Sequence, residues 1–114
     1  STRYPGLTAQ SGYAAARDIL DRYIALVPAL SAPHFVLAQL LYASGNPSAA
    51  AAEALKGKES YTEDLETARR AAVYYENVVD LKNAVFFLEE IVRIDPSNTA
   101  AANDLAKIRA YLSR

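Results

Sequence analysis

The sequence predicts an all-α fold in which about six helices stack as antiparallel pairs. Apolar residues recur at steps of three and four along most of the chain, which is the period of an amphipathic helix. Glycine and proline are scarce, with 4 and 5 among 114 residues, and 52% of the residues are hydrophobic. Small residues also return at one constant interval. This length suits a single domain spanning residues 1–114.

The first helix is expected over residues 13–27, and Pro28 ends it. Its apolar positions fall on one face. They are Ala16, Ile19, Leu20, Tyr23, Ile24 and Val27.

The second helix is expected to start at Pro33, because the first turn of a helix tolerates proline. It ends at Gly45-Asn46-Pro47, a turn signal that also opens the next helix. The third helix is expected to run from Pro47 to Leu55 and to fade into the polar segment at 56–59.

The fourth helix is expected from about Leu65, and its pattern changes phase around Asp80. The fifth then runs to Asp95-Pro96. Ser97 or Asn98 is expected to cap a sixth, because both side chains can accept a hydrogen bond from the first turn.

Small residues recur in register along these helices. Ala16, Ala50 and Ala84 follow one another at intervals of 34 residues, and the same interval separates Ala38 from Ala72. A fixed period of this length indicates repeated helix pairs stacked as an α-solenoid, with the alanines where the helices touch.

On these residues the chain resembles the tetratricopeptide repeat family, whose repeat has this length. The copy that fits best is 65–98, with Ala72, Tyr75, Ala84, Leu88 and the closing Asp95-Pro96. Residues 31–64 form a second copy, residues 7–30 a partial repeat, and residues 99–113 a C-terminal capping helix. The copies depart from the family pattern: His34 and Ala68 replace an aromatic residue, Val79 replaces the turn glycine, and Thr62 replaces the closing proline.

The resemblance implies a concave groove, lined by the first helix of each pair, that accepts an extended or helical peptide. The groove-facing positions carried over from the family are Phe35, Gln39, Tyr42, Arg69, Arg70, Val73, Asn77, Asn103 and Lys107. They combine aromatic and amide groups with basic ones, which could hold an apolar anchor and a carboxylate together.

Two interpretations remain open for charged residues of this set and near it. Arg69 and Arg70 could meet a peptide carboxylate, or they could pair within the chain, for instance with Glu66. His34 is the only histidine, and we interpret it as a surface or capping residue.

Composition argues against several functions. The net charge of -1 gives no support for a nucleic-acid partner. Without cysteine and with one histidine, a metal site or another bound cofactor is not expected. The apolar stretch at 35–43 is too short for membrane insertion. The sequence carries no phosphate loop, nucleophile elbow or paired metal-ligand spacing, so we do not expect an enzyme.

The leading hypothesis is therefore a protein–protein interaction scaffold that binds a partner protein or peptide in the groove. The alternative is an assembly module that forms a homo-oligomer through the unpaired helix at 13–27. An accessory domain of a larger, bacterial assembly is a third hypothesis. Cytoplasm and periplasm both suit a chain without cysteine, and we favour the cytoplasm.

Overall fold

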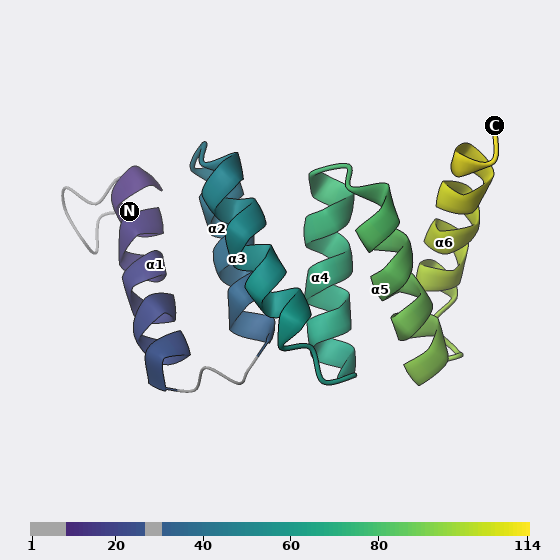
Figure 1. The fold of residues 1–114 in the computed structure, drawn as a ribbon, viewed down its shortest axis with the longest axis horizontal. Helices are drawn as coiled ribbons and strands as arrows, with labels where there is room; N and C mark the ends of the chain where they lie inside the picture. The colour runs from purple at the N-terminus through teal and green to yellow at the C-terminus, as the bar shows by residue number, and fades with distance from the viewer. Residues whose placement is uncertain (1–8, 27–30) are drawn as a thin grey trace. The chain divides into compact units, whose positions relative to one another are not determined.

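The computed structural model describes residues 9–26 and 31–114, and within them all regular structure is helical. The six predicted helices are all present (Figure 1). Their bounds are α1 (Ala9–Leu26), α2 (Ala32–Ala43), α3 (Pro47–Glu59), α4 (Leu65–Asn77), α5 (Leu81–Ile94) and α6 (Thr99–Leu112). The first helix begins four residues before its predicted start at Tyr13. The predicted stop at Pro28, and Val27 before it, lie outside the described residues.

The chain divides into two compact units, Ser1–Ser60 and Tyr61–Arg114. In the first unit, α2 packs against both α1 and α3. In the second unit, α5 packs against both α4 and α6, and it runs antiparallel to each (Figure 1). The single domain over 1–114 and the solenoid arrangement stay predictions.

Four alanines of the predicted repeat lie in the cores of these units. Ala38 and Ala50 are fully buried in the first unit, and Ala84 and Ala72 are buried in the second. A methyl group is the largest side chain that leaves two helix backbones close together, and each lost contact in a packed interior costs stability. The prediction that these small residues occupy buried positions is confirmed.

Phe35 does not lie on a surface open to a partner, as the groove hypothesis requires. Its ring is fully buried and packs against the backbone of Gly57 on α3. A Cβ atom added at Gly57 would lie 2.7 Å from Phe35 Cε2. The same contact accounts for the length of α3, which continues through the segment predicted to fade, because the ring fills the space beside the glycine.

His34 is buried rather than at the surface, so its predicted placement is wrong. Its Nδ1 donates a hydrogen bond to Glu53 Oε2 on α3, and Lys56 Nζ lies 3.6 Å from the other oxygen of that carboxylate. A buried imidazole needs such a partner. The sequence does not place Glu53 opposite His34, since the two residues are on different helices.

Side-chain caps fix the helix starts in the second unit. Asp64 accepts a hydrogen bond from the Thr67 amide at 2.9 Å, and Asp80 accepts one from the Asn83 amide at 3.3 Å. Asn98 does the same for the Ala101 amide at 3.0 Å, which confirms it as the cap of α6. Each bond satisfies an amide that has no partner inside its own helix.

The turns that close α2 and α4 repeat each other. Gly45 and Val79 both adopt the left-handed conformation, with φ of 86° and 60°. The hydrogen bonds around them match as well: the residue after each turn position, Asn46 or Asp80, donates its amide to the carbonyl five residues earlier. This is the geometry in which a helix ends on a glycine. Val79 therefore takes a backbone conformation that suits glycine and strains a β-branched residue.

Replacing Val79 by glycine is expected to stabilise the protein. The left-handed conformation costs an L-residue about 1–2 kcal/mol, and glycine's extra freedom when unfolded returns about 0.5–1 kcal/mol of that. The side chain is 70% exposed, so little packing is lost. We expect Val79→Gly to raise the free energy of unfolding by about 0.5–1 kcal/mol in urea denaturation.

Two variants act as controls for this prediction. Val79→Ala keeps a Cβ atom and should gain less than the glycine variant. Gly45→Val introduces the same strain in the other turn, where an added Cβ would meet nothing within 4 Å, so it should destabilise. An equal gain for alanine and glycine at Val79 would show that the backbone is not the cause.

Candidate functional site

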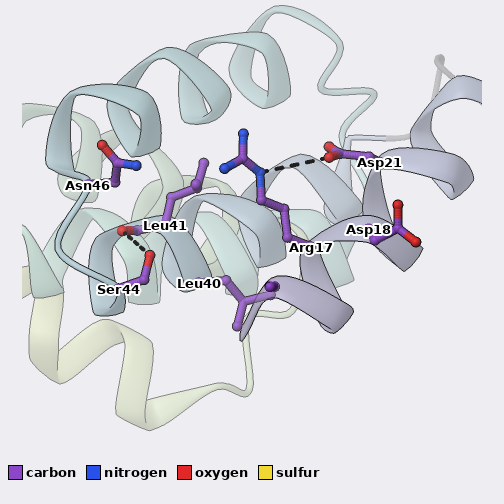
Figure 2. Close-up of a pocket in the computed structure, with 8 residues that line it drawn as sticks. Arg17, Asp18, Asp21, Leu40, Leu41, Ser44 and Asn46 are labelled. Carbon is purple, nitrogen blue, oxygen red and sulfur yellow. Dashed lines mark hydrogen bonds and ion pairs between the residues drawn. The ribbon is translucent and has the colours of Figure 1, made fainter. Parts of the chain in front are cut away.

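A pocket of about 270 Å³ lies between α1 and α2 in the first unit (Figure 2). Its charged groups already have partners within the chain: Arg17 Nε lies 3.8 Å from Asp21 Oδ2, and Asp18 pairs with Arg22. The Ser44 hydroxyl donates to the Leu41 carbonyl oxygen at 3.0 Å. Because these groups are satisfied locally, the pocket offers little unmet polarity to a ligand.

The second unit contains a pocket of about 230 Å³ formed by all three of its helices. One face of α4 supplies Arg69, Ala72, Val73 and Glu76, at the spacing that aligns side chains along a helix. The remaining lining residues are Leu88 and Ile91 on α5 and Asn98, Ala100, Ala101 and Asp104 on and before α6. We call this the α4–α6 pocket.

The α4–α6 pocket has an apolar floor and opposite charges at its two ends. Leu88, Ile91 and Ala101 are buried beneath it, while Val73 stays 49% exposed in the lining. Arg69 lies two helical turns before Glu76, a separation of about 10 Å along α4. Asp104 lies near Glu76. The pocket is therefore basic at one end and acidic at the other.

Glu76 is the least satisfied polar group of this pocket. Its Oε1 atom is buried and accepts no hydrogen bond from any described residue. Burial raises the pKa of the Glu76 carboxyl, and the nearby Asp104 charge raises it further. Both effects disfavour the charged form.

A second polar cluster, in the same unit, is fully paired. The Tyr61 hydroxyl donates to Glu90 Oε1 at 2.8 Å, and Arg93 bonds both that carboxylate and Glu63. Hydrogen bonds from Arg93 hold the pKa of Glu90 below its usual range, and burial raises the pKa of Tyr61. This cluster ties the segment before α4 to α5 and leaves Glu90 satisfied, in contrast to Glu76.

The structure brings together two of the nine residues predicted to line a groove. Arg69 and Val73 line the α4–α6 pocket. Arg70 is exposed but its Nε donates to Glu66 at 2.9 Å, so the two interpretations of the arginine pair divide between its members. The other predicted residues of this unit are exposed and are not among those that line the pocket: Asn77, Asn103 and Lys107. In the first unit Tyr42 is exposed, Gln39 is half-buried and Phe35 is fully buried.

Sequence reasoning missed the acidic end of the pocket. Glu76 could have been found from the helical spacing that links it to Arg69 and Val73. Asp104 had no such signal, because its position depends on how α6 packs over α5.

Other kinds of site gain no support from the described residues. None of the helices in residues 9–26 and 31–114 is long and apolar enough to cross a bilayer. In the same ranges no three His, Cys, Asp or Glu residues gather as metal ligands would.

Comparison with protein-family models, curated proteins and solved structures finds no match for this chain.

Replacing Glu76 by glutamine is expected to stabilise the protein at neutral pH. Because the folded-state pKa of Glu76 lies above its unfolded value, wild-type stability falls as the pH rises from the unfolded to the folded pKa. The uncharged glutamine does not contribute to that fall. We expect the variant to melt at a higher temperature near pH 7 and at nearly the wild-type temperature at a pH below the unfolded pKa of about 4.3.

Glu66→Gln on the same helix is the matched control for this measurement. Glu66 is exposed and paired with Arg70, so its removal should change stability little. A Glu76→Gln effect that is the same at all pH values would rule out the carboxyl charge as its cause.

Proposed function

We propose that this chain is a protein-interaction module of the tetratricopeptide type, which binds a peptide segment of a partner protein in the α4–α6 pocket. The observation that carries the proposal is the pocket itself: an apolar floor, an exposed valine and charged residues at both ends. Pockets of this composition bury an apolar group and orient it through a few polar contacts.

The repeated features of the chain support the type of module. The buried alanines recur at the interval found in the sequence, and the left-handed turns at Gly45 and Val79 recur at the same interval. The helix pairs α2–α3 and α4–α5 pack internally. In such repeats the first helices of successive pairs present the binding surface, and α4 and α6 hold that place in the proposed module.

The size and charge of the pocket limit what it can hold. A space of about 230 Å³ accommodates one or two side chains rather than a whole helix. The exposed Arg69 forms no ion pair with any residue of the described ranges, so its guanidinium is available to a carboxylate. We therefore propose an extended peptide with an apolar side chain over the floor and an acidic group at Arg69.

Neighbouring arginines give a sharp test of this function. Seven-residue peptides would be selected from a random displayed library against the whole chain, and their binding site would be mapped by NMR on the Val73 and Ala101 amides. Arg69→Glu should weaken the selected peptides by about tenfold, because a charge-assisted hydrogen bond is replaced by repulsion.

Arg70→Glu is the control for that measurement, since Arg70 pairs with Glu66 outside the pocket. It should change affinity by less than about twofold. Far-UV circular dichroism should show the same helix content in both variants. Equal losses for the two variants would mean that general charge, rather than the pocket, attracts the peptides.

One observation favours the alternative function, assembly through the N-terminal helix. Ile19 on α1 is 66% exposed, although it belongs to the predicted apolar stripe. Its neighbours Ala16, Leu20 and Ile24 are half-buried, and α1 packs against α2. A second copy of the chain could cover Ile19.

Light scattering over a concentration series distinguishes the two functions. The binding module is expected to keep its monomer mass of 12.4 kDa, and Ile19→Asp should leave that mass unchanged. A mass that doubles with concentration, and that returns to the monomer value in Ile19→Asp, would favour assembly instead.

A further inference from the structure

The acidic end of the α4–α6 pocket asks for a ligand group that the chain does not supply. Glu76 from α4 and Asp104 from α6 line the same pocket, and the only basic residue in its lining is Arg69, two helical turns away along α4. Among the described residues, no donor reaches Glu76 Oε1. A buried carboxylate oxygen without a donor costs stability, and native structures contain few of them.

We propose that Glu76 and Asp104 receive the side chain of a lysine or arginine in the bound peptide. The proposal rests on the peptide-binding function and names the chemistry of its partner. An ammonium or guanidinium group would give both carboxylates a donor and would neutralise two like charges that now face each other. Rotation about the last torsion of Glu76, which is broad for glutamate, turns either oxygen toward the pocket.

The apolar part of the pocket fits the stem of such a side chain. Lysine and arginine carry several methylene groups, which pack on apolar surface while the charged head remains among polar groups. Val73 is exposed between the charged ends, one turn from Glu76, and Leu88 and Ile91 lie beneath. A small anion or a purely apolar ligand would leave Glu76 as it is.

A bare metal ion fits this end less well than an organic cation. Calcium takes six to eight oxygen ligands, whereas this end offers two carboxylates. No third His, Cys, Asp or Glu completes a cluster within the part of the chain that the structure describes. The observations therefore favour a peptide cation.

The spacing of the pocket's charges predicts a pattern in the peptide. Arg69 and Glu76 are about 10 Å apart along α4. An extended chain covers that distance in about three residues. The partner segment should carry an acidic and a basic residue three positions apart, with an apolar residue between them.

The test uses the whole chain and the seven-residue peptides selected from the random library. Peptides that map to the Val73 and Ala101 amides should be enriched in lysine or arginine. Replacing that residue by norleucine should weaken binding about tenfold. The double variant Glu76→Gln with Asp104→Asn should lose about the same factor, and combining both changes should cost little more, because each removes the same contact.

Glu66→Gln is the matched control, on the same helix but outside the pocket, and should stay within about twofold of wild type. Since removing the Glu76 charge is expected to stabilise the fold, lost binding by the double variant cannot be ascribed to unfolding. Helix content by circular dichroism checks this directly.

The outcomes separate this inference from the function on which it rests. Peptides that bind the pocket without a basic residue, or that bind the double variant as well as wild type, would overturn the inference and leave the peptide-binding function standing. Shifts at the Glu76 and Asp104 amides with calcium chloride alone, at submillimolar concentration, would also overturn it in favour of a metal. No peptide at the pocket would overturn both.

Discussion

Close approach of paired helices is the constraint on which the rest of this structure depends. Ala50 and Ala84 are fully buried, each in the second helix of its pair, and Gly57 touches the Phe35 ring directly. Short helices of this kind are marginal in isolation and gain their stability from the apolar faces that they bury together. Any larger side chain at these positions would push the helices apart. The small residues therefore decide which faces remain outside, and so which side chains can form a pocket.

The left-handed turns are the second consequence of this constraint. A pair of helices can pack closely only if the connection reverses the chain within a few residues, and the turn at Gly45 achieves this with a left-handed glycine. Val79 adopts the same geometry without the same freedom. The packing of α4 against α5 thus imposes a backbone conformation on a residue that does not prefer it. Matching hydrogen bonds at both turns show that the pair geometry, rather than the turn residue, determines the local structure.

Much of the fold could be predicted from the sequence, because helix starts and stops are local signals. Pro47, Asp80 and Asn98 mark helix starts by their own chemistry, and the alanine interval identified the buried positions. The site could be predicted only in part. Residues facing a pocket depend on the rotation of each helix about its axis, so one position separates Arg69 in the lining from Arg70 in a surface ion pair. His34 and Phe35 were placed outside for a related reason, since Glu53 and Gly57, which bury them, lie on another helix.

Val79 and Glu76 both break a local rule, and comparing them shows why only one of them points to function. The strain at Val79 lies in an exposed turn, is explained by the geometry of the helix pair, and would disappear with a glycine. The penalty at Glu76 has no such internal explanation: its carboxyl is desolvated, faces Asp104, and has an oxygen without a donor at the edge of a pocket. Helix packing would be served equally well by a neutral residue there. A group that costs the folded chain stability and would be satisfied by a ligand is what a binding site is expected to contain, because stability and binding place different demands on the same residue.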